Sequence, residues 1–199
     1  MNIDYTMLNE NRKRLLEWQA SHYVNESQSL RLNAGCGNAQ IDGYVNMDID
    51  NGDVNGDIRV MPFKDTCMDA ITCHHVLEHL PQRHIAKTIH EFSRILKDGG
   101  WLDIGVPDIE LVCKAFLEAS EKRKWNWYIY TIYGSQVKDG IHPSGATEDM
   151  PNAEGMFHRS GVSQKMLCDC LMANSFEVIE SYHYDGFGTP SVFILARKV

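Results

Sequence analysis

A strand that runs into two closely spaced glycines is the part of this sequence best suited to bind a ligand. Leu30–Asn38 reads L-R-L-N-A-G-C-G-N, an alternating apolar and polar segment followed by a G-x-G turn. Glycine has no Cβ, so such a turn lets the backbone approach a bound molecule closely. Two acids, Asp48 and Asp57, stand where the next two strands are expected to end. Carboxylates there can accept from ribose hydroxyls and from an adenine amino group, which predicts a ligand that carries a nucleoside.

Two common nucleotide-binding patterns do not fit this turn. The dinucleotide fingerprint G-x-G-x-x-G needs a third glycine, but Gln40 occupies that position, and Asp48 follows Gly37 sooner than the fingerprint expects. A phosphate-binding loop would continue with G-K-S/T, and this sequence does not. The remaining interpretation is a nucleoside ligand without a pyrophosphate, which points to S-adenosylmethionine before NAD or ATP.

A second chemical pattern lies in the segment His75–His79, which reads H-V-L-E-H. It matches H-x-x-E-H, the inverted pattern of some zinc proteases, and on a single helix His75 and His79 would share one face. The sequence shows no third ligand on a downstream helix. Packing and hydrogen bonding within a helix are therefore the favoured roles of these side chains.

Hydrophobic periodicity predicts the elements that must position these residues. The predicted strands are 29–34, 43–48, 54–58, 68–73, 101–106, 176–183 and 191–198. The predicted helices are 6–20, 75–80, one from Ile85 with Lys97 in its last turn and a stop at Gly99-Gly100, 108–119 with Asp108 as N-cap, 121–133 and 163–173. This alternation predicts an α/β fold with a mostly parallel sheet covered on both faces, and an antiparallel last strand.

Two later segments are predicted to differ, one as a buried helix and the other as a surface loop. An aromatic and aliphatic stripe at helical spacing predicts core packing; it comprises Trp125, Tyr128, Ile129, Ile132 and Tyr133. Residues 134–160 are rich in Gly, Pro and Asn and lack periodicity, and a loop of that length in a small domain is typical of an active-site lid.

Composition bounds the class of protein. The 199 residues, 43% of them hydrophobic, suit a single domain over 1–199, and no apolar run is long enough to span a membrane. The net charge of −8 and the scattered basic residues argue against a nucleic-acid partner. The six cysteines show no C-x-x-C spacing, which predicts reduced residues in a soluble cytoplasmic protein. The sequence does not indicate an oligomeric state.

Several ordered motifs together resemble the class I S-adenosylmethionine-dependent methyltransferases, in particular the small type-11 group. The motifs are N-A-G-C-G-N, G-Y-V-N-M-D, G-D-I-R-V-M-P-F, M-D-A-I-T-C-H-H-V-L-E-H-L, R-I-L-K-D-G-G-W-L-D-I-G-V-P-D and the later F-H-R-S-G. The resemblance implies a Rossmann-like, doubly wound, seven-stranded sheet of order 3-2-1-4-5-7-6, with strand 7 antiparallel and helices on both faces. It also implies S-adenosylmethionine as the cofactor.

The same resemblance assigns roles to individual residues. The cofactor contacts that it implies are Asn33, Gly35, Cys36, Gly37, Asp48, Ile49, Asp57, Ile58 and His74. Asn33 and the glycines would face the methionine part, Asp48 would hold the ribose hydroxyls, and Ile49 would pack on the adenine. Asp57 and Ile58 would contact the adenine edge, and His74 would lie near the sulfonium. Asn33 replaces the acid more common at its position, so backbone carbonyls, water or the N-terminal segment would hold the cofactor ammonium.

Methyl transfer needs a nucleophile held in line with the sulfonium and away from water. His74, His142 and His158 are candidate proton acceptors, because imidazole titrates near neutral pH. The expected acceptor is a small molecule or a sugar-linked compound.

Two alternatives remain open at this stage. One is a non-catalytic, cofactor-binding accessory protein. The other is a metal-assisted O-methyltransferase, since similar enzymes carry an acid-x-x-Glu-His version of the helix that bears His75, Glu78 and His79. Its fourth ligand is ambiguous among His142, Glu154 and His158, and the favoured prediction is that no metal binds.

Overall fold

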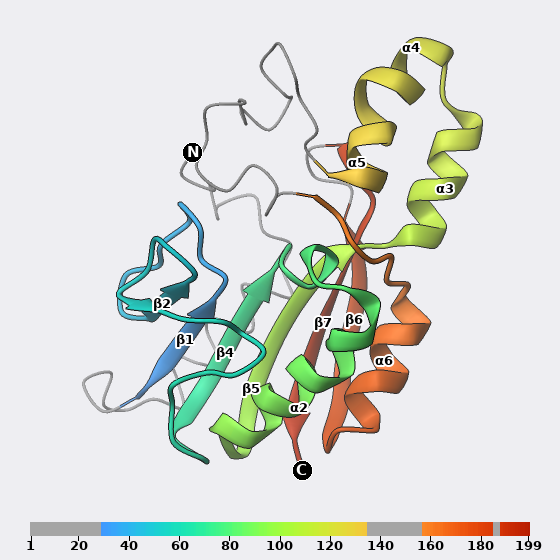
Figure 1. The fold of residues 1–199 in the computed structure, drawn as a ribbon. Helices are drawn as coiled ribbons and strands as arrows, with labels where there is room; N and C mark the ends of the chain where they lie inside the picture. Colours follow the sequence, from blue (N-terminus) through green and yellow to red (C-terminus); the bar gives the residue numbers. More distant parts are fainter. Residues whose placement is uncertain (1–28, 135–156, 185–187) are drawn as a thin grey trace.

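The computed structural model describes residues 29–134, 157–184 and 188–199, which form one seven-stranded sheet flanked by helices (Figure 1). The strands are β1 (Arg31–Ala34), β2 (Val45–Asp48), β3 (Val54–Asn55), β4 (Met68–His74), β5 (Leu96–Pro107), β6 (Phe176–Tyr184) and β7 (Ser191–Lys198). Their order is β3-β2-β1-β4-β5-β7-β6, and β7 pairs antiparallel with both β5 and β6. The remaining neighbours pair in parallel, so the predicted topology is confirmed.

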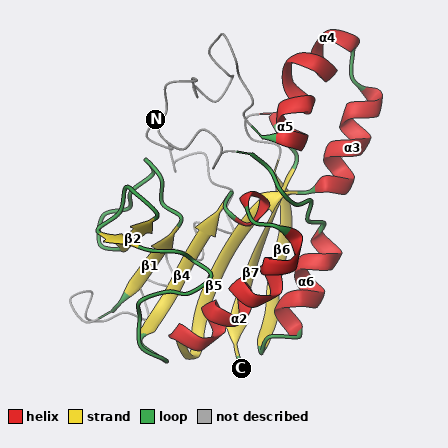
Figure 2. Ribbon diagram, viewed as in Figure 1, coloured by secondary structure: helices red, strands yellow, loops and turns green. Residues whose placement is uncertain are grey.

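The helices occupy two regions of the molecule (Figure 2). They are α2 (Ile85–Ile95), α3 (Ile109–Glu118), α4 (Glu121–Arg123), α5 (Ile129–Tyr133) and α6 (Gln164–Met172), with short 3-10 turns η3 (Leu77–His79) and η4 (Gln82–His84) and a π-helical turn η5 (Lys124–Tyr128). Helices α2 and α6 lie in front of the sheet in Figure 1, whereas α3, α4 and α5 lie beyond the carboxyl end of β5.

The core forms between α2, α6 and one face of the sheet. Leu102, Ile104 and Val106 alternate along β5 and are fully buried, and Ile89 and Phe92 of α2 join the same cluster. The apolar residues that alternate along the strand therefore pack against the apolar face of the helix, as the sequence predicts.

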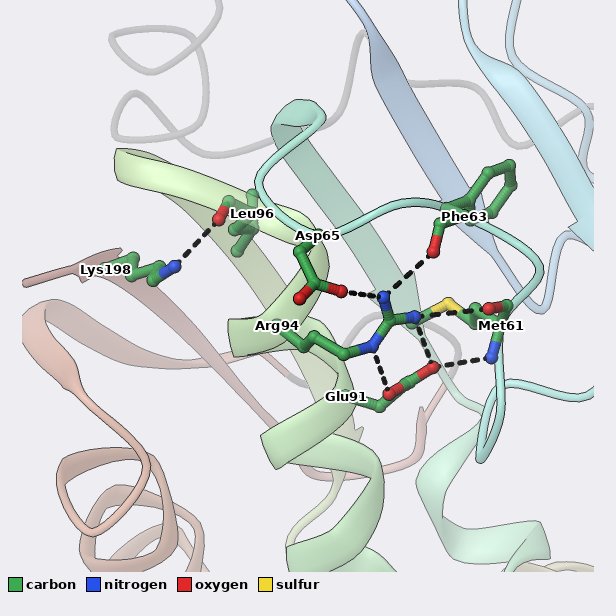
Figure 3. Close-up of polar contacts among 7 residues, drawn as sticks. All are labelled: Met61, Phe63, Asp65, Glu91, Arg94, Leu96 and Lys198. Atoms are coloured by element: carbon green, nitrogen blue, oxygen red, sulfur yellow. Dashed lines mark hydrogen bonds and ion pairs between the residues drawn. The ribbon is translucent and has the colours of Figure 1, made fainter.

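One ion-pair network fastens the segment before β4 to helix α2 (Figure 3). The Arg94 guanidinium donates to both oxygens of Glu91, at 2.7 and 2.8 Å, and to Asp65 Oδ1 at 2.6 Å. It also donates to the carbonyls of Phe63 and Met61, and Met61 N donates to Glu91 Oε1 at 2.7 Å. We call these five residues the Arg94 clamp. The clamp therefore ties the segment 61–65 to helix α2.

The end of α2 differs from the sequence prediction. The helix ends at Ile95, and Leu96 is already extended and paired with Met68. Lys97 and Gly99-Gly100 therefore lie in β5, where the register shifts and Gly99 takes φ +74°. Lys198 Nζ donates to the Leu96 carbonyl at 2.9 Å at this junction (Figure 3). A partner from β7 thus satisfies a carbonyl at the helix end that the local sequence leaves open.

The aromatic stripe is also not the predicted core. A π-helical turn over Lys124–Tyr128 interrupts the helix and changes the phase of its faces. Tyr128 is buried, but Trp125 is 61% exposed and Tyr133 is exposed as well. Trp127 instead anchors the segment by donating from Nε1 to the Gly188 carbonyl at 2.8 Å.

The predicted helix 6–20 and most of the predicted lid 134–160 lie outside the described residues. None of the helices within the described ranges is long and apolar enough to cross a membrane. All six cysteines are described and free; Cys36 and Cys73 are buried, whereas Cys113 is exposed.

Candidate functional site

The candidate site lies where the parallel strands β1, β2 and β4 end. The glycine turn follows β1, Asp48 ends β2 and His74 ends β4. The carboxyl ends of neighbouring parallel strands meet at one edge of a sheet, which is where open α/β sheets bind ligands.

The two glycines of the turn serve different purposes. A Cβ on Gly35 would come within 2.4 Å of Val76 Cγ2, so this glycine lets the chain after β4 pack against the turn. A Cβ on Gly37 would meet no atom of the described residues within 4 Å, so this part of the protein leaves space over Gly37 for a ligand. Both have positive φ, +72° and +48°, a conformation that glycine adopts without strain. Gly37 therefore fits the predicted ligand contact, and Gly35 acts mainly through packing.

Asp48 organises the turn beside it. Its Oδ2 accepts from Gly37 N at 2.8 Å and its Oδ1 accepts from Ile49 N at 2.7 Å. Asn51 Nδ2 donates to the Gly37 carbonyl at 3.1 Å. Each carboxylate oxygen can accept a second hydrogen bond, so Asp48 keeps acceptor capacity for a pair of hydroxyls.

Asn33 supports the turn from inside the protein. Its amide nitrogen donates to the Ala39 carbonyl and to Asn46 Oδ1, both at 2.9 Å, and the side chain is buried. Asn46 Oδ1 also accepts from Ile41 N. The two amides thus form a buried network that the sequence did not reveal, and Asn33, a predicted cofactor contact, uses its amide hydrogens to hold the turn.

Cys36 lies between the two glycines and is buried. Its backbone N donates to the Met47 carbonyl at 3.0 Å. Burial, assisted by the Asp48 carboxylate, raises the pKa of the Cys36 thiol to about 11. The thiol therefore stays protonated at neutral pH.

The residues predicted to contact an adenine differ in accessibility. Ile49 is 68% exposed, which leaves its side chain free to pack on a flat ring, whereas Ile58 is 6% exposed and belongs to the core. Ile58 therefore offers a ligand little accessible surface. Asp57 lies beyond the end of β3 and accepts from the Arg59 guanidinium through both oxygens. Hydrogen bonds from Arg59 lower the pKa of the Asp57 carboxyl, although burial opposes them.

His74 has a carboxylate and an aromatic ring beside it. Its Nε2 lies 3.1 Å from Asp103 Oδ1, and its ring meets Phe193 edge-on with centroids 5.1 Å apart. Phe193 also stacks on Tyr182 and covers Gly105, where a Cβ would come within 2.4 Å of the ring. Asp103 and Phe193 were missed from the sequence, because only strand pairing brings them to β4.

A second group of residues that could bind a ligand follows Val76, which packs on the glycine turn. Ligand-capable atoms of Glu78, His79 and His158 all fall within 4.8 Å of one another, and we call these three residues the histidine cluster. The backbone of the later segment is fixed there, because His158 N donates to the Tyr133 carbonyl at 3.0 Å and Arg159 N donates to the Glu78 carbonyl at 2.7 Å. Of the residues proposed as a fourth ligand, His142 and Glu154 lie outside the described ranges.

His75 does not occupy the place that the sequence predicts. It has φ +56°, and the helical turn starts only at Leu77, so His75 and His79 do not share a helix face. The H-x-x-E-H interpretation as a protease motif therefore fails. His75 Nδ1 lies 3.3 Å from Glu78 Oε1, which makes His75 a partner of the carboxylate.

Electrostatics in the histidine cluster favour a charged Glu78 and a neutral His158. Burial, the largest single influence, raises the pKa of Glu78, but the hydrogen bond from His75 and the surrounding imidazoles bring its net pKa below the ordinary value. Burial also lowers the pKa of His158, and Glu78 opposes this only in part.

Comparison with known protein families matches the first part of the described chain. A family model described as a methyltransferase domain matches residues 32–104, from β1 into β5. No curated protein matches the sequence.

Solved structures share the whole fold at low sequence identity. A SAM-dependent methyltransferase from Methanosarcina mazei has a TM-score of 0.61 and 18% identity, over 91% of this chain and 97% of that chain. Magnesium protoporphyrin IX methyltransferase from Synechocystis PCC 6803, solved with bound SAH, has a TM-score of 0.58 and 13% identity, over 96% and 83%. The cyclase SpnF has a TM-score of 0.53 and 15% identity, over 93% and 80%. The fold is thus shared by proteins that are named for different reactions.

Proposed function

We propose that this chain is a class I S-adenosylmethionine-dependent methyltransferase of the type-11 group, and that it methylates a small-molecule or sugar-linked acceptor by in-line displacement. The methyltransferase-domain model over residues 32–104 and the shared fold support this proposal. Its cofactor is S-adenosylmethionine, whose sulfonium supplies an already activated methyl group. The protein must therefore hold the two reactants in line and exclude water.

The geometry of Gly37 and Asp48 is the observation that carries the proposal. The space that the described residues leave over Gly37 and the spare acceptor capacity of Asp48 fit a ligand with a ribose and without a pyrophosphate. The exposed Ile49 side chain, next in sequence, would pack on the adenine. Asp57 would accept from the adenine amino group only while it also holds Arg59, so we assign it the weaker contact.

His74 is our candidate for the proton acceptor. Asp103, 3.1 Å from its Nε2, would stabilise the imidazolium that forms when an acceptor loses its proton. His158, the other candidate, donates from Nδ1 to the Thr131 carbonyl at 2.7 Å and so could take a proton only at Nε2. The net charge of −8 favours a small acceptor over a nucleic acid, and the free cysteines fit a reducing compartment such as the cytoplasm.

Calorimetric titration with S-adenosylmethionine tests the cofactor site. Asp48→Ala should weaken binding about 10- to 100-fold, because a charged acceptor is lost. Asp50→Ala, at an exposed acid nearby, is the matched control and should bind as the wild type does. Unchanged affinity in a folded Asp48→Ala protein would place the cofactor elsewhere.

Turnover separates an enzyme from an accessory protein. Formation of S-adenosylhomocysteine is measured with a panel of hydroxyl, amine and sugar acceptors. His74→Gln should lower turnover and change its pH profile, because the candidate proton acceptor is lost. Cofactor binding without turnover of any acceptor would instead favour the non-catalytic alternative.

A further inference from the structure

We infer that the histidine cluster is a binding site for one divalent first-row transition-metal ion, held by a Glu78 oxygen and one ring nitrogen each of His79 and His158. Candidate ligand atoms of all three residues lie within 4.8 Å of one another. Ligand atoms at 2.0–2.2 Å from one ion, as for Zn²⁺ with nitrogen and carboxylate ligands, lie at most about 4.4 Å apart, so small side-chain rotations would bring these three atoms around a single ion.

The hydrogen bonds of the two imidazoles select the atoms that would bind. His158 Nδ1 lies 2.7 Å from the Thr131 carbonyl and His79 Nδ1 lies 3.4 Å from the Phe157 carbonyl. A carbonyl only accepts, so each Nδ1 carries the hydrogen and each Nε2 keeps its lone pair. Metal-binding histidines typically donate their other N–H to a carbonyl or carboxylate in this way.

The Glu78 carboxylate has one oxygen to spare. Oε1 faces His75 Nδ1 at 3.3 Å, whereas Oε2 is buried and has no hydrogen-bond partner within the described part of the chain. The residue is only 3% exposed. Leaving a buried carboxylate oxygen unpaired is costly, so an unsatisfied oxygen beside two imidazoles indicates a partner that binds all three.

The donor set indicates the class of ion. Imidazole nitrogen suits Zn²⁺, Co²⁺ and Fe²⁺ better than Mg²⁺ or Ca²⁺, which prefer oxygen ligands. Three protein ligands also leave at least one coordination position open. An open position is characteristic of sites that bind a substrate or water and do not serve only as a structural staple.

The cluster lies beside the proposed methyl-transfer site. Val76 packs on Gly35 of the glycine turn, and the His75 ring meets Phe193 with centroids 6.0 Å apart. An ion in the cluster would bind an oxygen of the acceptor and lower the pKa of its hydroxyl, a catalytic role that rests on the proposed function. Metal binding itself does not depend on that function.

The test uses full-length protein without a histidine tag, stripped of metal by a chelator and titrated with Co²⁺ alone. We expect one Co²⁺ per chain, with visible d–d absorption, and displacement by Zn²⁺. Glu78→Gln and His158→Gln should each weaken Co²⁺ binding about 100-fold or more, which exceeds the effect of losing a residue that only hydrogen-bonds to a metal ligand. His75→Asn, which tolerates the positive φ, should cost only about tenfold because His75 orients the carboxylate.

His90→Gln, at an exposed histidine on α2, is the matched control and should bind Co²⁺ as the wild type does. Circular dichroism confirms that each variant is folded, and the metal-free protein is titrated separately with S-adenosylmethionine. Failure of cofactor binding with intact Co²⁺ binding would refute only the proposed function. Absence of stoichiometric Co²⁺ binding to folded wild type, or equal binding by Glu78→Gln, His158→Gln and the control, would overturn the metal site.

Discussion

Two glutamates, Glu91 on helix α2 and Glu78 on the short turn η3, show opposite uses of a carboxylate. In the Arg94 clamp, both Glu91 oxygens accept hydrogen bonds, from Arg94 and from Met61 N (Figure 3). In the histidine cluster, Glu78 is more deeply buried, yet one of its oxygens has no partner among the described residues. All the hydrogen bonds that the Glu91 carboxylate needs are therefore made within the clamp, as expected for a structural role. The Glu78 carboxylate lacks such a complete set, and this difference suggests a binding role for the histidine cluster and a structural role for the clamp.

The largest effect is expected in the clamp. Arg94→Met leaves the Glu91 carboxylate and two backbone carbonyls without their donor, and should lower the free energy of unfolding by about 2–3 kcal/mol. Urea denaturation measures this loss, with Lys87→Met on the exposed side of α2 as control. Adding Glu91→Met to Arg94→Met should restore part of the stability, because the unpaired charge is removed. A loss no greater than that of the control would show that the clamp is dispensable.

A smaller, pH-dependent effect is expected from Glu91→Gln. Hydrogen bonds from Arg94 lower the pKa of Glu91 below its usual 4.5, although burial opposes them. A depressed carboxyl pKa stabilises the folded protein above the unfolded pKa, and this contribution is lost as pH falls through the folded pKa. Glu91→Gln should therefore cost about 1 kcal/mol at pH 7 and progressively less below pH 4.5. Unfolding measured from pH 7 to pH 3 would show a constant difference if the ion pair were unimportant.

The smallest effect is expected in metal-free Glu78→Gln. The mutation removes a buried charge that is only partly paired, and His75, its partner, is nearly half exposed. These terms oppose each other, so the free energy of unfolding should change by less than about 1 kcal/mol. A cost that matches or exceeds that of Glu91→Gln would mean that Glu78 is structural, and the contrast between the two regions would disappear.

Local signals account for most of the fold that could be predicted from the sequence. Asp108 caps α3 through its Oδ1, which accepts from Glu110 N, and Ser163 caps α6 in the same way through Met166 N. Such caps and the alternation of apolar residues are properties of a few neighbouring positions. The order of the elements then restricts the sheet to very few topologies.

The sequence predicts that Gly37 and Asp48 lie together, but not the contacts of the residues around them. Asp48 and Gly37 meet because β1 and β2 are adjacent parallel strands, which the pattern indicates. His75 takes φ +56° while its N donates to the Gly105 carbonyl of β5, a contact that no local pattern encodes. His158 reaches Glu78 only through the return of a distant segment. Long-range packing, rather than propensity, decided these features.

The approach of Gly105 to Phe193 links two positions on different strands. A methyl group at 105 would occupy space that the ring at 193 already fills, so any larger residue at 105 needs a smaller one at 193. Substitutions at positions 105 and 193 should therefore be coupled in evolution. In a laboratory library, a smaller residue at 193 is therefore the change that has to come before any larger residue at 105.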